Sequence, residues 1–151
     1  MKDFMKEALK LAQKAFDKDE VPIGAVVVQN GKIISRGYNT REKSQNAIKH
    51  AEIIAIEKAC KKLKSWRLDD CELYVTLEPC PMCAGAIANA RITKLHYGCK
   101  EKTSCDHLCE SILTSERLNH KTEIIFEEEY EQEISILLST FFKTKRKKKD
   151  D

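Results

Sequence analysis

The sequence from residue 73 to residue 86 reads Leu73-Tyr74-Val75-Thr76-Leu77-Glu78-Pro79-Cys80-Pro81-Met82-Cys83-Ala84-Gly85-Ala86. Residues 72–77 are mostly apolar and predict a buried strand. A Pro-Cys-Pro turn follows, and Pro81 is suited to the first turn of the short helix that we predict over 84–90. The stretch therefore predicts a strand, a tight turn and a helix, with two cysteines at the start of the helix.

Cys80 and Cys83 are candidate metal ligands. Two cysteines three apart share one face of a helix, and the positive potential at a helix N-terminus favours the deprotonated thiol that binds metal. The pair alone would fit a redox dithiol or a chance arrangement equally well. His50 stands near the start of another predicted helix. It supplies a third ligand and leaves one position of a tetrahedral zinc ion open for water.

Glu52 is the candidate catalytic residue. Residues that are two positions apart on a helix do not share a face, so Glu52 is poorly placed to bind the same ion as His50. It is better placed to take a proton from water whose pKa the zinc lowers, and to return that proton elsewhere. The alternative is a solvated glutamate at a helix start, which the helix dipole favours.

The remaining pattern predicts alternating helices and strands. Asn30-Gly31 separates two apolar runs and is a strong hairpin signal. Apolar spacing predicts helices over 3–18, 48–63, 84–90 and 130–145, and strands over 23–28, 32–38, 72–77, 92–97 and 122–126. Residues 99–111 show no clear period and are expected to be irregular. This order predicts an α/β fold, a three-layer α/β/α sandwich with a mixed five-stranded sheet that begins with an antiparallel hairpin.

Length and composition indicate one compact domain. The chain has 151 residues, of which 42% are hydrophobic. We expect a domain over 1–145 and a basic tail over 146–151. Neither an apolar signal core nor a run long enough to span a bilayer is evident, so we expect a cytoplasmic protein with no membrane partner. Seven cysteines, an odd number, favour metal ligation and free thiols over a disulfide framework.

Charge alone does not identify a partner. The net charge is only +3, but residues 143–149 read Lys-Thr-Lys-Arg-Lys-Lys-Lys and follow an acidic stretch. One interpretation is a helix with acids at its start and bases at its end, which fits the helix dipole. The other interpretation is phosphate binding by the basic run.

The two motifs together, His50-Ala51-Glu52 and Pro79-Cys80-Pro81-Met82-Cys83, match the signature of zinc-dependent nucleobase deaminases. The resemblance extends to other stretches that, in order and spacing, are similar to the family of tRNA-specific adenosine deaminases. These stretches are Val21-Pro22-Ile23-Gly24-Ala25-Val26, Asn39, Trp66-Arg67-Leu68, residues 73–86, Asn119-His120 and Phe141-Phe142.

The resemblance, which covers nearly the whole chain, implies a fold, a partner and further site residues. It implies the cytidine-deaminase-like fold, one zinc ion per subunit, a homodimer, and hydrolytic conversion of the wobble adenosine of a tRNA anticodon loop to inosine after base flipping. It implies that Asn39 hydrogen-bonds the base and that Ile23, Gly24 and Ala25 form a wall of the pocket. Phe142 and Arg146 match aromatic and basic positions near the end of the family's last helix, which meets the anticodon loop.

One segment departs from the family pattern. After Gly98 the family usually carries an Asp, then a Lys and a glycine-containing loop, whereas residues 99–107 here contain Glu101 near the Asp position and no glycine. This difference concerns the reading of flanking nucleotides and leaves the zinc chemistry untouched. Cys99, Cys105, His107 and Cys109 suggest a second metal site, although buried cysteines and a surface histidine are the more common meaning of such a set.

Two rival functions remain open on the sequence. The first is a deaminase of free bases or nucleotides, of the guanine or cytosine type, which needs no basic tail. The second is a structural zinc module that binds RNA without chemistry. The second explains Glu52 poorly, and it expects four ligands where three are evident.

Overall fold

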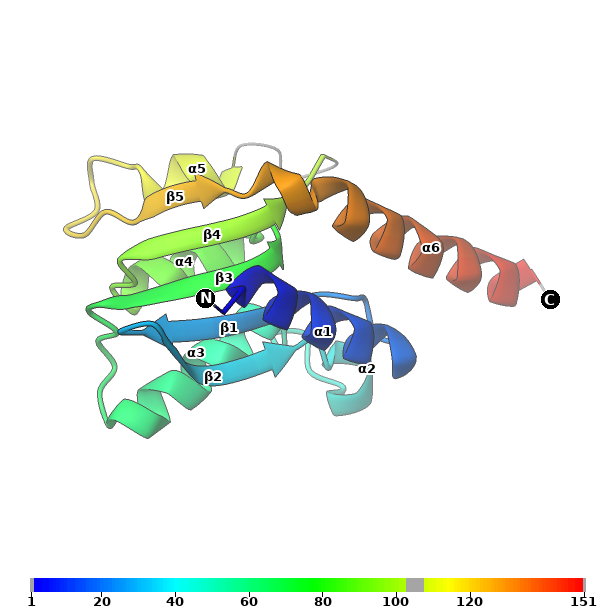
Figure 1. The fold of residues 1–151 in the computed structure, drawn as a ribbon, viewed down its shortest axis with the longest axis horizontal. Helices are drawn as coiled ribbons and strands as arrows, with labels where there is room; N and C mark the ends of the chain where they lie inside the picture. The colour runs from blue at the N-terminus through cyan, green and yellow to red at the C-terminus, as the bar shows by residue number, and fades with distance from the viewer. Residues whose placement is uncertain (1, 103–107, 151) are drawn as a thin grey trace.

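A mixed five-stranded sheet forms the centre of the molecule (Figure 1), as the computed structural model of residues 2–102 and 108–150 shows. The strand order is β2-β1-β3-β4-β5. The strands are β1 (Gly24–Gln29), β2 (Lys32–Tyr38), β3 (Cys71–Leu77), β4 (Lys94–Cys99) and β5 (Glu123–Phe126). β1 is antiparallel to both β2 and β3, whereas β3, β4 and β5 run parallel. The predicted mixed sheet and its N-terminal hairpin are confirmed.

Helices cover both faces of this sheet. They are α1 (Phe4–Asp17), α2 (Arg41–Ser44), α3 (Ala51–Leu63), α4 (Pro81–Asn89), α5 (Leu108–Leu113) and α6 (Glu131–Asp150). Figure 1 shows α1 and α6 on the front face and α3, α4 and α5 behind the sheet. The three-layer prediction is therefore confirmed, and the second half of α6 extends past the sheet.

Besides shifts of up to three residues at the ends of α3, α4 and β4, the structure differs from the sequence prediction at three places. α5 begins inside the segment 99–111 that was predicted to be irregular and ends beyond it, because Cys109 and Leu113 are both buried at helical spacing. The short α2 was not predicted, and the carboxylate of Glu20 accepts hydrogen bonds from the backbone amides of Glu42 and Lys43 in its first turn. α6 continues to Asp150 instead of ending near residue 145.

The hairpin turn has the geometry that its sequence predicts. Asn30 and Gly31 both have positive φ angles, 51° and 75°. Two consecutive residues in this region match the type I′ turn, whose twist suits a two-residue hairpin. The turn thereby pairs β1 with β2 at the edge of the sheet.

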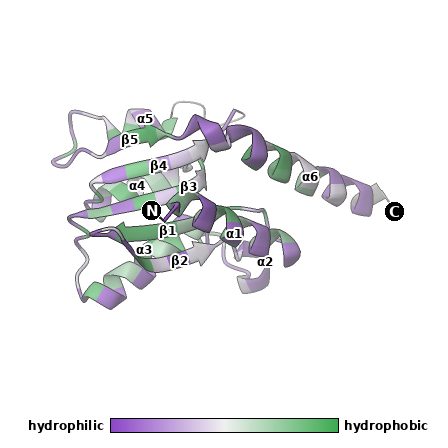
Figure 2. Cartoon of the chain, viewed as in Figure 1, coloured by the Kyte–Doolittle hydropathy of each residue, from purple (hydrophilic) through white to green (hydrophobic). Residues whose placement is uncertain are grey.

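Successive side chains along each strand point to opposite faces of the sheet, and helices bury both faces. Ala25, Val27, Leu73 and other apolar residues form a core cluster with residues of α3 and α4, while buried alanines of α1 cover the opposite face. Figure 2 shows β1 as largely hydrophobic and α1 as alternating between hydrophobic and hydrophilic residues. Gly37 lets α3 approach β2, because a Cβ atom there would lie 2.5 Å from the carbonyl oxygen of Ala51.

This packing brings the first turns of α3 and α4 together beside the carboxyl end of β3, where the predicted metal ligands lie. In parallel sheets, ligands commonly bind at the carboxyl ends of the strands. Across residues 2–102 and 108–150, no helix is long and apolar enough to cross a membrane.

Candidate active site

His50, Cys80 and Cys83 converge on one point. His50 and Cys80 are the N-cap residues of α3 and α4, and Cys83 lies in the first turn of α4. The Nδ1 atom of His50 is 3.7 Å from the sulfur of Cys80 and 3.7 Å from that of Cys83. All three potential ligand atoms lie within 4.8 Å of one another. In the described part of the chain, this is the one group of histidine, cysteine and acidic side chains with such spacing.

The two thiols differ in acidity. A hydrogen bond from Cys83, supported by His50, lowers the pKa of the Cys80 thiol to about 4. The pKa of Cys83 is raised because its thiol donates a hydrogen bond to Cys80 and because the residue is buried. The contact with Cys80 raises the pKa of His50. The low pKa of Cys80 favours its thiolate form, and a divalent cation would favour the loss of the Cys83 thiol proton as well.

Glu52 is buried beside this cluster. Only 3% of the residue is exposed, and its Oε1 atom has no hydrogen-bond partner. Burial raises the pKa of its carboxyl group to about 7. A solvated helix-start glutamate, the alternative interpretation of the sequence, does not fit this position. A buried carboxyl group with a pKa near neutrality is suited to accept and return protons.

A cavity of about 590 Å³ opens onto the cluster. Its wall includes His50, Glu52 and Cys80 on one side and side chains of α6 on the other. A smaller adjoining cavity of about 110 Å³ shares His50 and contains Asn39 in its wall. The cluster thus lies at the base of a pocket wide enough to admit a nucleobase.

Only some of the other predicted site residues line this pocket. Ile23 lines both cavities, and Asn39 lines the smaller one. Phe142 lines the larger cavity with 44% of its surface exposed. Gly24 packs against Ala8 of α1, and Ala25 is buried in the core cluster.

Neither Gly24 nor Ala25 is among the lining residues of the two cavities, because both lie on faces of β1 that helices cover. Arg146 is exposed and is likewise absent from the lining residues. The structure therefore brings Ile23, Asn39 and Phe142 to the pocket.

Comparison with known proteins identifies the family of this site. A model of the MafB19-like deaminase family matches residues 1–146. A tRNA-specific adenosine deaminase of Bacillus subtilis (strain 168) is 50% identical over 147 residues, which cover 97% of this chain and 91% of that protein. The chain belongs to the tRNA-specific adenosine deaminase family. A relative from Rickettsia bellii (strain RML369-C) with the same name is 46% identical and covers 92% of this chain and 97% of its own length.

Two solved structures of deaminases share the fold of this chain. A structure from work on A-to-I editing by tRNA:A34 deaminases at the wobble position superposes with a TM-score of 0.82 at 38% identity, covering 89% of this chain and 98% of that chain. A guanine deaminase from Bacillus subtilis superposes less well, with a TM-score of 0.62 at 44% identity, and covers 64% of this chain and 62% of its own.

Several pocket residues were not predicted from the sequence of this tRNA-specific adenosine deaminase family member. Arg41 lines both cavities, and Lys100 and Ser139 line the larger one. Lys100 follows the carboxyl end of β4, where ligands gather in parallel sheets, so its position carried a usable signal. Arg41 and Ser139 carried none, because their positions depend on how α2 and α6 pack.

Cys99 and Cys109 do not resemble metal ligands. Cys99 and Cys109 are buried, and burial raises the pKa of their thiols to about 11 and about 12. Neither belongs to a described group with metal-ligand spacing. Cys105 and His107, the other members of the suggested second metal site, lie outside the described residues.

Proposed function

We propose that this chain hydrolyses the wobble adenosine of a tRNA anticodon to inosine and ammonia. The observation that carries the proposal is the unpartnered, buried Oε1 atom of Glu52 beside a His-Cys-Cys cluster at the base of an open pocket. The names of the relatives support the substrate, because they include a tRNA(adenine(34)) deaminase from Arabidopsis thaliana that is 58% identical over 99 residues, covering 66% of this chain and 8% of that protein.

The donor set fits one zinc ion, which His50, Cys80 and Cys83 would hold. One imidazole and two thiols around a common point are ligands that zinc prefers, and three protein ligands are usual for catalytic sites. When bound, the ion supplies Lewis-acid activation of water at neutral pH. His50, Cys80 and Cys83 would hold this ion beside the carboxyl group of Glu52.

Glu52 moves the protons in this proposal. Its carboxylate takes a proton from the attacking water and delivers it to N1 of adenine. It then takes the proton of the new hydroxyl group on C6 and transfers it to the amino group, which leaves as ammonia when the C–N bond breaks and the C6 carbonyl of inosine forms. The reaction consumes one water and forms inosine, so no other reactant is needed.

The pocket walls orient the base. We propose that the side-chain amide of Asn39 hydrogen-bonds the purine and that Ile23 packs against it. Asn39 is buried and held by a hydrogen bond from the amide of Arg41 to its Oδ1 atom at 3.1 Å. Its Nδ2 group is 3.4 Å from the carbonyl oxygen of Val21, a long contact that leaves it able to turn to a substrate.

α6 offers a surface for the nucleotides around the base. Phe142 and Arg146 are spaced four apart, so they share the stripe of α6 that begins in the pocket at Ser139. Lys145 instead pairs with Asp19, with its Nζ atom 2.7 Å from the carboxylate. We propose that Phe142 stacks on a nucleotide next to the flipped adenosine and that Arg146 meets a phosphate.

Two further features rest on family membership. We propose a homodimer and a cytoplasmic location, since tRNA is the substrate. Exposed apolar side chains such as Trp66, with 62% of its surface accessible, are compatible with a partner subunit. Sedimentation of the purified protein at micromolar concentration tests the dimer.

The decisive experiment incubates the purified protein with total tRNA and sequences the product for adenosine-to-inosine changes. The proposal expects inosine at the wobble position of a small number of tRNAs and none with Glu52→Gln. Free guanine, adenosine and cytosine are assayed in parallel. Turnover of a free base without change in tRNA would favour the rival deaminase function, and no turnover with intact zinc would favour a binding module.

A further inference from the structure

His96 occupies an unusual position on β4. Its side chain is only 9% exposed and lies on the face of the sheet that α1 covers. The ring stacks on Tyr74 of β3, with centroids 3.9 Å apart and planes 8° from parallel. The mechanism proposed above uses none of these residues.

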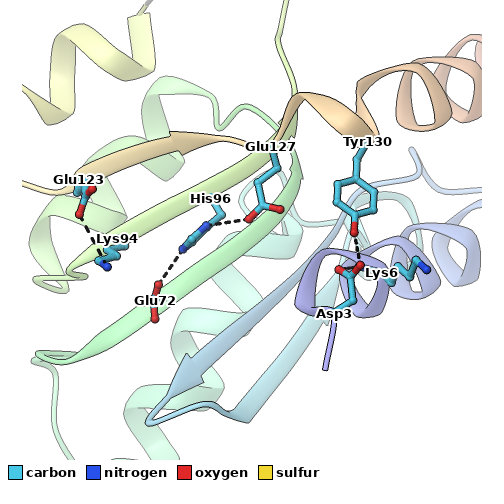
Figure 3. Close-up of polar contacts among 8 residues, drawn as sticks. All are labelled: Asp3, Lys6, Glu72, Lys94, His96, Glu123, Glu127 and Tyr130. Atoms are coloured by element: carbon cyan, nitrogen blue, oxygen red, sulfur yellow. Dashed lines mark hydrogen bonds and ion pairs between the residues drawn. The ribbon is translucent and has the colours of Figure 1, made fainter. Parts of the chain in front are cut away.

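Each ring nitrogen of His96 faces a carboxylate. Nε2 is 2.8 Å from Oε1 of Glu72, and Nδ1 is 2.9 Å from Oε1 of Glu127 (Figure 3). A neutral imidazole has one donor and one acceptor, whereas two carboxylates both require donors. Each ring nitrogen that carries a proton donates a charge-assisted hydrogen bond to the carboxylate that it faces. Lys94 and Glu123, further along the same face, pair with each other at 4.0 Å.

Glu127 lies in the turn that leads from β5 into α6. Its backbone amide donates to the carbonyl oxygen of Tyr97 at 2.9 Å, and its side chain reaches His96. The next residues form the 3-10 helix Glu128–Tyr130, which runs directly into α6. Tyr130 donates a hydrogen bond to Asp3, the N-cap residue of α1 (Figure 3). The start of α6 is thus held by β4 through Tyr97 and His96 and by α1 through Asp3, and the Glu131 carboxylate accepts a hydrogen bond from the amide of Lys100.

α6 in turn forms one wall of the pocket. Ser135, Leu138, Ser139 and Phe142 line the cavity, whereas the metal ligands lie on α3 and α4 behind the sheet. A shift in the turn before α6 would move this wall and leave the reacting groups in place. The contact between His96 and Glu127 is therefore coupled to the shape of the pocket and not to its chemistry.

We propose that His96 is a positioning residue, clamped between Glu72 and Glu127, which fixes the start of α6 and through it the substrate-facing wall of the pocket. The effect on substrate rests on the proposed function, but the effect on α6 does not. Loss of the clamp should loosen α6 and weaken substrate binding, with little effect on the chemical step.

The test compares Glu127→Ala with Glu127→Gln, because glutamine can still accept a hydrogen bond from Nδ1. Glu123→Ala is the matched control, since it removes a carboxylate from the same face that contacts Lys94 and not the turn. Hydrogen exchange of the α6 amides, zinc content, and KM and kcat on tRNA are measured for each protein.

Glu127→Ala should exchange the amides of residues 131–142 at least about tenfold faster, because a charge-assisted hydrogen bond typically contributes at least that factor. Exchange in β3 and α4 and the zinc content should not change, KM should rise severalfold, and kcat should change by less than about twofold. Glu127→Gln should restore most of the loss.

Three outcomes would overturn the proposal. They are unchanged exchange in α6, faster exchange throughout the chain, or equal effects in Glu123→Ala. A wild-type protein inactive on tRNA would instead refute the proposed function, and the exchange comparison would still decide the role of His96.

Discussion

Replacing Glu52 by glutamine should abolish turnover and also remove a pH-dependent loss of stability. In the metal-free protein, burial raises the pKa of Glu52 from the ordinary 4.5 to about 7. The folded state therefore binds a proton more tightly than the unfolded state. Stability is greatest below the unfolded pKa of 4.5 and falls as the pH rises through the folded pKa near 7.

The size of this loss follows from the pKa change. Each tenfold change in proton affinity corresponds to about 1.4 kcal/mol, so the change to about 7 destabilises the metal-free wild type by about 3 kcal/mol between pH 4.5 and pH 8. Glutamine does not titrate, so Glu52→Gln should lack this loss of stability with rising pH. Burying the glutamine amide changes the free energy of unfolding by the same amount at every pH. It therefore does not alter the comparison, which uses only the slope of that free energy with pH.

The assay is urea unfolding of both proteins after chelation, at several pH values between 4.5 and 8, with circular dichroism confirming a cooperative transition for each. The zinc-loaded proteins are assayed for turnover, which should fall by at least about 10²-fold in Glu52→Gln. Parallel pH slopes for the two proteins would refute the argument that burial sets the acidity of Glu52. Near-normal turnover in Glu52→Gln would refute its role in proton transfer.

Three further predictions concern the metal and the tail. Cys80→Ser or Cys83→Ser should lose zinc and thermal stability together, because the free energy of metal binding also stabilises the fold, and metal analysis of the wild type should give one ion per chain. Phe142→Ala should weaken tRNA binding by about 1–3 kcal/mol without changing its salt dependence, and a loss of thermal stability with unchanged binding would show instead that the ring is a packing residue. Deleting residues 143–151 should weaken binding and flatten its dependence on salt while zinc content stays constant, and identical binding across a salt series would exclude the tail from recognition.

The local elements of this protein were largely predictable because their signals are short in range. Asn30 and Gly31 specify a hairpin by their tolerance of positive φ, and apolar periodicity specifies the main helices and strands. The ligand triad was also readable, because Cys80 and Cys83 are spaced on one helical turn and His50 begins another helix. The signature of the two motifs directed attention to zinc and to Glu52.

Only tertiary structure decided the burial of Glu52, which gives a common helix-start glutamate an unpartnered Oε1 atom and a carboxyl pKa near 7. It also decided which residues face the pocket. Ala25 packs into the core although it neighbours pocket residues in sequence, whereas Arg41 reaches the pocket from a helix that sequence did not predict. The contact of His96 with Glu127 joins residues 31 positions apart. Such contacts depend on the crossing of packed elements, and no local pattern encodes that geometry.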